Sequence, residues 1–142
     1  MQVKDVMVPE VKTIAPAATI RQAAQVMKQF HIGSLIVVDK AKLAGIVTDR
    51  DILEKVVAPG SVAAKVKVAD IMTKKVVMIA PDADVEEAAE VMVARKIKKL
   101  PVVEDNSLVG IVTATDICAS EPRLMEQISE LFQVGKKKVM AG

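Results

Sequence analysis

Aromatic side chains are nearly absent from this chain of 142 residues, which has no Trp, no Tyr and two Phe. The two are Phe30 and Phe132. Proteins that bind single-stranded nucleic acids stack the bases on aromatic rings, and this chain offers almost no such platform. A planar ligand would have to be held by aliphatic side chains and backbone groups. The shortage argues against a nucleic-acid partner, and so does a formal net charge of only +2.

Cysteine and histidine are also scarce, with Cys118 and His31 as the single example of each. One cysteine cannot form a disulfide within the chain, and this pair supplies too few ligands for a zinc site. The first residues lack the basic and then apolar profile of a signal peptide. No apolar run approaches the roughly 20 residues that span a bilayer. We therefore expect a cytoplasmic protein with no membrane partner, no metal site and no catalytic cofactor.

The sequence repeats itself after 65 residues. Residues 3–53 align with residues 68–118 without a gap, and 23 of these 51 pairs are identical. Chance similarity between two segments rich in Val and Ala would not keep glycine, proline, threonine and aspartate in register. Gly-Ile-Val-Thr at 45–48, for example, recurs at 110–113. We interpret the chain as a tandem duplication.

Each copy predicts the same order of elements, β-α-β-β-α. An extended run such as Val11–Ile14 leads to an Ala-Pro pair, and the residue before a proline disfavours helix. A helix then begins after Thr19 or Asp84, which are the expected N-caps. Two β-branched runs around a polar turn predict a hairpin, and a second helix starts at Thr48 or Thr113. The expected fold class is α/β in the broad α+β sense.

Four segments are expected along the chain. They are a first repeat at 1–58, a linker at 59–66, a second repeat at 67–120, and a C-terminal helix with a basic tail at 121–142. The helix carries an apolar stripe formed by Leu124, Met125, Ile128, Leu131 and Phe132. This stripe either lies across its own repeat or packs against a second chain, and we expect it to help form a homodimer. Lys136–Lys138 are interpreted as a solvated tail.

The motif Thr-x-x-Asp ends both copies, as Thr48 to Asp51 and as Thr113 to Asp116. Two interpretations of it stay open from the residues alone. The motif is a capping-box variant, which needs no ligand. Alternatively, the hydroxyl and the free N–H groups at the helix start face a phosphate, while the carboxylate accepts hydrogen bonds from a ribose diol.

Taken together, these motifs resemble the cystathionine-β-synthase (CBS) domain family, two of whose units form a Bateman module. The resemblance covers about residues 1–120. It rests on Asp-x-Met at 5–7 and 70–72, on the Ile-Ala-Pro elements, on Leu100-Pro101-Val102-Val103-Glu104, and above all on the Gly-Ile-Val-Thr-x-x-Asp endings. It implies two repeats packed sheet to sheet about a pseudo-twofold axis, with two clefts for adenosine-type ligands. It also implies that modules pair into dimers.

The resemblance also implies which residues line each cleft. In the preferred cleft, Asp116 binds the ribose, Lys98 and Lys99 neutralise phosphates, and Ile111 packs on the base. That cleft comprises Thr13, Ala18, Ile32, Gly33, Lys98, Lys99, Ile111, Thr113, Thr115 and Asp116. The second cleft comprises Ser34, Ile46, Thr48, Arg50, Asp51, Met78, Ala83 and Ile97. Because Gly33 and Ser34 replace the basic pair there, Arg50 and His31 are its expected cations.

The function that these features predict is binding rather than catalysis. The ligand expected is AMP, ADP, ATP or S-adenosylmethionine, and the regulated protein is expected to be a separate chain. No nucleophile–base pair is visible, and a single histidine leaves few routes to acid–base catalysis near neutral pH. The alternative is a structural dimerisation module whose clefts are vestigial.

Overall fold

The computed structural model describes residues 1–132 and divides the chain into two compact units. Unit 1 comprises Met1–Glu10, Val77–Asp105 and the chain from Val109 onward. Unit 2 comprises Val11–Val76 and Asn106–Leu108. Each unit contains both helices and strands, which confirms the predicted mixed α+β class.

Unit 2 follows the predicted order of elements. They are β1 (Thr13–Ile14), α2 (Ile20–Phe30), β2 (Ser34–Asp39), β3 (Lys42–Thr48), α3 (Asp49–Ile52), the π-helix η1 (Leu53–Val57), the 3-10 turn η2 (Ala63–Lys65) and α4 (Val68–Ile71). β1 pairs with β2 in parallel, and β2 pairs with β3 as an antiparallel hairpin. The buried face of α2 is formed by Ile20, Ala23 and Met27, which share one side of a helix because of their spacing.

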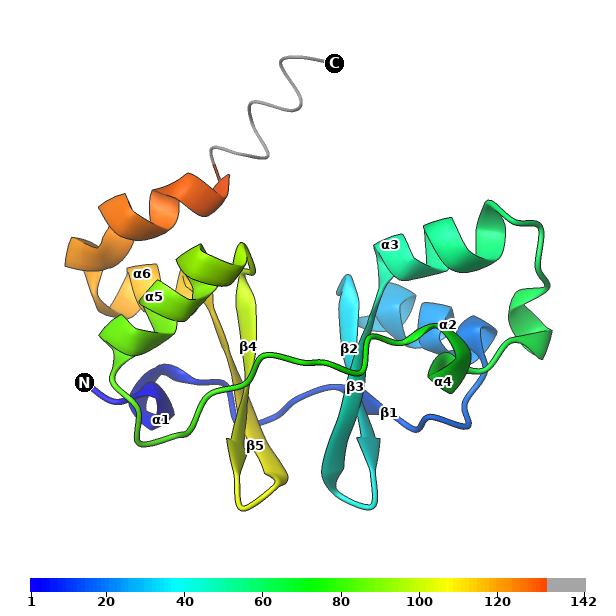
Figure 1. The fold of residues 1–142 in the computed structure, drawn as a ribbon, viewed down its shortest axis with the longest axis horizontal. Helices are drawn as coiled ribbons and strands as arrows, with labels where there is room; N and C mark the ends of the chain where they lie inside the picture. The colour runs from blue at the N-terminus through cyan, green and yellow to red at the C-terminus, as the bar shows by residue number, and fades with distance from the viewer. Residues whose placement is uncertain (133–142) are drawn as a thin grey trace, which may run out of the picture. The chain divides into compact units, whose positions relative to one another are not determined.

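Unit 1 repeats this arrangement, except that a single bridge replaces the strand equivalent to β1. Its elements are α1 (Val3–Val6), α5 (Val85–Arg95), β4 (Lys99–Glu104), β5 (Ser107–Thr113, of which the first two residues fall in unit 2), α6 (Ala114–Ser120), the 3-10 turn η3 (Pro122–Leu124) and a helical segment at 125–132. β4 neighbours β5, and α5 and α6 lie beside them (Figure 1). The extended run predicted at 76–79 forms only one parallel bridge, from Ile79 to Val102.

The two long helices begin differently, although both N-caps were predicted alike. Thr19 and Gln22 form the expected capping box, with bonds of 2.9 and 3.1 Å between each side chain and the other residue's backbone N–H. Asp84 is the N-cap residue of α5, as predicted, but its side chain makes no capping bond. The first amide of each helix donates to a backbone carbonyl of another segment of its own unit, Val85 to Met1 in α5 and Ile20 to Val66 in α2. The two helix starts therefore differ only in the side-chain cap.

The segment that leads each sequence repeat packs on the elements of the other repeat. In unit 1, Val8 and Ile111 exchange two backbone hydrogen bonds of 2.8 and 2.9 Å. In unit 2, Thr73 and Ile46 exchange two of 2.9 and 3.0 Å. The buried side chain of Val3 completes the unit 1 core. Each compact unit is therefore assembled from segments of both repeats.

Close packing against these leading segments explains the repeated glycine and the Asp-x-Met motif. A Cβ added to Gly110 would lie 2.6 Å from Met7 Sδ and 3.0 Å from the carbonyl oxygen of Val8. Gly45 has the same relation to Met72 and Thr73. In each motif, the aspartate caps the short helix that precedes the methionine. Both motif residues therefore shape the leading segment.

The C-terminal helix lies across its own unit (Figure 1). Most of its apolar stripe therefore packs on the same chain and not on a second chain. Leu124, Ile128 and Leu131 are buried in the unit 1 core, whereas Met125 and Phe132 stay exposed. Lys136–Lys138 lie outside the described residues. Arg123 pairs with Glu86 of α5 at the start of this helix and thereby lowers the pKa of the Glu86 carboxyl. The helix is part of the fold of unit 1.

Replacing Gly110 with Ala should destabilise the protein by about 1–3 kcal/mol, because the new methyl group overlaps Met7 and the backbone of Val8. The sign is informative, since Gly→Ala at an unhindered position usually stabilises a fold. Urea denaturation followed by circular dichroism measures it. The cost should shrink when Met7 is already Ala, and an equal cost in both backgrounds would contradict the proposed overlap.

Shortening Ile128 to Ala should cost about 2–5 kcal/mol, because this fully buried side chain leaves a cavity in the unit 1 core. Met125→Ala on the same helix is the matched control, and should change stability by less than about 0.5 kcal/mol because that side chain is exposed. Similar losses in the two variants would show that the helix does not pack as described.

Candidate functional site

The candidate site in unit 1 is the junction between β5 and α6. The Thr113 hydroxyl accepts a hydrogen bond of 3.1 Å from the backbone N–H of Asp116, and Asp116 Oδ2 accepts one of 3.1 Å from the backbone N–H of Thr113. This is a complete capping box. The strand therefore ends and the helix begins at two side chains that fix each other's position.

The junction between β3 and α3 in unit 2 has the same geometry. Thr48 and Asp51 bond reciprocally, at 3.1 Å to the hydroxyl and 3.0 Å to Oδ2. The capping interpretation of Thr-x-x-Asp is therefore confirmed in both copies. Capping uses only one oxygen of each carboxylate, so it leaves the second oxygen to distinguish the two junctions.

The second carboxylate oxygen has different surroundings in the two copies. Asp51 Oδ1 lies 3.3 Å from Lys55 Nζ, and Lys55 also donates to the carbonyl of Ile71. Among residues 1–132, Asp116 Oδ1 has no such ion pair or hydrogen bond. The i, i+4 spacing of Asp51 and Lys55 was a signal that sequence analysis could have used. Half-buried Asp116 therefore retains an acceptor that Asp51 has committed.

The two junctions also differ in charge. In unit 1, the carbonyl of Lys98 accepts a bond of 2.8 Å from the backbone N–H of Ala114, which places Lys98 beside the helix start. In unit 2, Gly33 occupies the equivalent position, and the Asp49 carboxylate lies 2.9 Å from where its Cβ would be. The Arg50 side chain pairs with Glu54 at 2.7 Å. The unit 1 junction therefore carries a lysine at the position where the unit 2 junction carries a glycine.

The remaining predicted residues divide between the units. Within unit 2, His31 is the left-handed C-cap of α2, and Ile32, Gly33 and Ser34 follow it into β2, where Ser34 pairs with Thr48. Thr13, Ala18 and Ile46 also belong to unit 2. Met78, Ala83, Ile97, Lys98, Lys99, Ile111, Thr113, Thr115 and Asp116 belong to unit 1. Each predicted cleft draws on both units, so its assembly stays a prediction.

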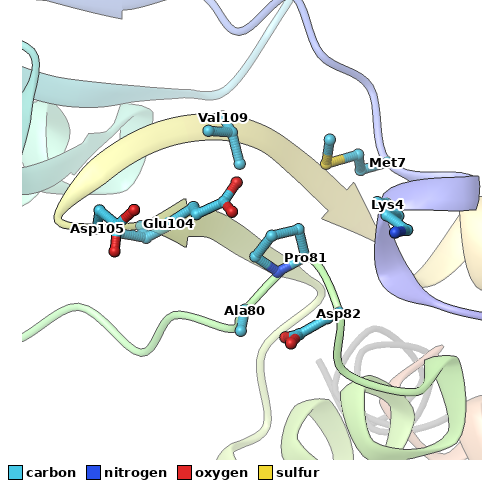
Figure 2. A pocket seen from close by; sticks show the side chains of 9 residues that line it. Lys4, Met7, Ala80, Pro81, Asp82, Glu104, Asp105 and Val109 are labelled. Atoms are coloured by element: carbon cyan, nitrogen blue, oxygen red, sulfur yellow. The ribbon is translucent and has the colours of Figure 1, made fainter.

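A cavity of about 460 Å³ in unit 1 lies away from the Thr113–Asp116 junction (Figure 2). Its floor is apolar, whereas Lys4, Asp82, Glu104 and Asp105 surround it. Glu104 and Asp105 precede β5, while Thr113 ends it, and a seven-residue strand is about 20 Å long. Three carboxylates would repel a phosphate. Sequence analysis did not single out this cavity, and we assign no nucleotide to it.

The described part of the chain also bears on two other classes of site. No group of three or more His, Cys, Asp or Glu side chains there could hold a metal ion. No helix among residues 1–132 has the length and apolar character to cross a membrane.

Comparison with known proteins identifies the family. The family model described as "CBS domain" matches twice, at residues 3–58 and 68–121. The CBS domain-containing protein YhcV of Bacillus subtilis is 37% identical over 119 residues, covering 84% of each chain. Inosine-5′-monophosphate dehydrogenase of Methanocaldococcus jannaschii is 41% identical over 115 residues, but the chain spans only 22% of that enzyme.

A solved structure supports the same assignment. The CBS domain pair of protein MJ0100, in complex with 5′-methylthioadenosine and S-adenosyl-L-methionine, is 34% identical with a TM-score of 0.74. The match covers 84% of this chain and 94% of that one. The two matched ranges coincide with the internal duplication. The chain belongs to the CBS domain family and carries two copies of the domain in tandem.

Proposed function

We propose that this chain is a regulatory module that binds an adenosine-type ligand, namely AMP, ADP, ATP or S-adenosylmethionine. The CBS pair of MJ0100 binds two adenosine derivatives, and its similarity to this chain extends over most of both proteins. The proposed ligand fits the scarcity of aromatic residues, because aliphatic side chains such as Ile111 can pack on an adenine ring.

The observation that carries the proposal is the uncommitted oxygen of Asp116. One carboxylate oxygen closes the cap and so fixes the side chain, while Oδ1 has no ion pair or hydrogen bond in residues 1–132. A fixed carboxylate with a spare oxygen can accept hydrogen bonds from a ribose diol at little entropic cost. Lys98 beside the same junction adds positive charge for the ligand's phosphates.

We propose that the preferred ligand residues are those at the unit 1 junction together with Thr13, Ala18, Ile32 and Gly33. The equivalent site around Asp51 should bind more weakly, because Lys55 already occupies its carboxylate and Asp49 adds negative charge. The specific phosphate and base contacts implied by the family resemblance belong to this proposal.

One observation favours the alternative of a structural module. Both Thr-x-x-Asp motifs are complete capping boxes without a ligand, so their presence alone does not require one. We propose binding without catalysis, since the similarity to inosine-5′-monophosphate dehydrogenase covers only 22% of that enzyme. We further propose that the module is cytoplasmic, forms a homodimer and regulates a protein on another chain.

The ligand proposal predicts binding in the micromolar range, with a rise in melting temperature by mass action. Isothermal calorimetry and thermal melts with AMP, ATP and S-adenosylmethionine measure both effects. Because the chain has no Trp or Tyr, a co-purified adenine would also dominate its absorbance near 260 nm. No heat and no thermal shift with any of the three would favour the structural module.

Asp116→Ala should weaken binding of that ligand about tenfold or more, since a hydrogen bond to a charged group contributes about 1.5–3 kcal/mol. Asp51→Ala should weaken it less, because Lys55 already holds that carboxylate. Calorimetric titration of both variants measures the difference.

The two variants control for each other, because each removes the same cap. Both should lose about 1 kcal/mol of stability, so a difference in affinity cannot be attributed to unfolding. Equal losses of affinity would refute the asymmetry between the junctions. Complete loss of folding in either would favour a purely structural role for the motif.

A further inference from the structure

The C-terminal helix contacts a predicted ligand residue directly. Lys98 Nζ lies 5.0 Å from the centroid of the Phe132 ring. A lysine ammonium group within about 6 Å of a ring face is attracted by the ring's quadrupole. Phe132 is one of only two aromatic residues in the chain.

Lys98 lies in the bend that precedes β4. It lines a cavity together with Val93 of α5 and Leu131 of the C-terminal helix. The Lys98 side chain is therefore within reach of the helical layer of unit 1.

The helix is anchored at the same turn. Leu131 is only 8% exposed and belongs to the unit 1 core, so the position of the adjacent Phe132 follows from core packing. A cavity of about 130 Å³ lies here, lined by Val93, Lys96, Lys98, Glu130 and Leu131. The Lys98 side chain therefore borders this cavity, and its ammonium group lies near the half-exposed Phe132 ring.

We propose that Phe132 is a specificity-determining residue, because it holds the Lys98 ammonium group and so lowers affinity for phosphorylated adenosine ligands relative to adenosine itself. The inference rests on the proposed function. A phosphate that recruits Lys98 must draw it off the ring, so the phosphate and the C-terminal helix compete for one cation. By linkage, phosphate binding also weakens the hold on the end of this helix.

Calorimetry with ATP and with adenosine tests the proposal. Phe132→Leu keeps an apolar side chain but removes the ring, and should tighten ATP binding about two- to fivefold, the range expected for an exposed cation–π contact. Adenosine affinity should not change. Phe132→Tyr, which restores a ring, should behave like the wild type. Met125→Leu, at an equally exposed site of the same helix, is the matched control and should have no effect.

The Lys98→Ala background provides the decisive comparison, because Phe132→Leu should have no effect on ATP binding there. A fold-change that persists without Lys98, or that is equal for adenosine, would overturn the role of the cation. Unchanged ATP binding in Phe132→Leu would overturn the inference alone. If the wild type binds neither ATP nor adenosine, the proposed function fails and this inference fails with it.

Discussion

Paired backbone hydrogen bonds between Val8 and Ile111, and between Thr73 and Ile46, hold each compact unit to a segment that lies far away in the sequence. The rest of each unit depends on this contact. The leading segment passes directly over the strand that ends in the Thr-x-x-Asp motif, and the strand carries glycine at the crossing because no side chain fits there. Short capped helices, α1 and α4, then direct each segment to the start of a long helix. The position of the candidate site follows from this order, because the crossed strand is the one that places Thr113 and Asp116.

Capping and the proposed ligand binding draw on the same two side chains. The hydroxyl and one carboxylate oxygen fix the helix start, and in doing so they fix the remaining oxygen without any ligand present. Such a site needs little reorganisation on binding. It also explains why the motif persists in both copies although their charges differ: Asp51 keeps its cap while Lys55 takes its other oxygen. In Asp116, one carboxylate oxygen makes the cap, and the other is the proposed ligand acceptor.

The sequence predicted local features well where one short segment decided the outcome. The helix that starts after Thr19 and both Thr-x-x-Asp caps depend on residues within four positions of one another, and the duplication is read directly by aligning the chain with itself. Position was predicted better than contact at α5, where Asp84 is the N-cap residue but its side chain makes no capping bond. Residue spacing also says little where distant segments decide the outcome. Likewise, an apolar stripe at 124–132 indicates that something covers it, but periodicity cannot say whether the cover is the same chain or another. The family resemblance named site residues on both units, and local patterns could not test how they combine.

Each repeat contributes its leading segment to the core of the other repeat, and this affects where the chain can be cut. A cut between the two repeats would separate each leading segment from the core on which it packs in this structure. Residues 1–66 would carry Val3 without the core that it completes, and residues 67–142 would carry α4 without α2. Neither half encodes a closed core, although the two halves together do. The pair of repeats is therefore the unit in which the structure shows both cores to be complete.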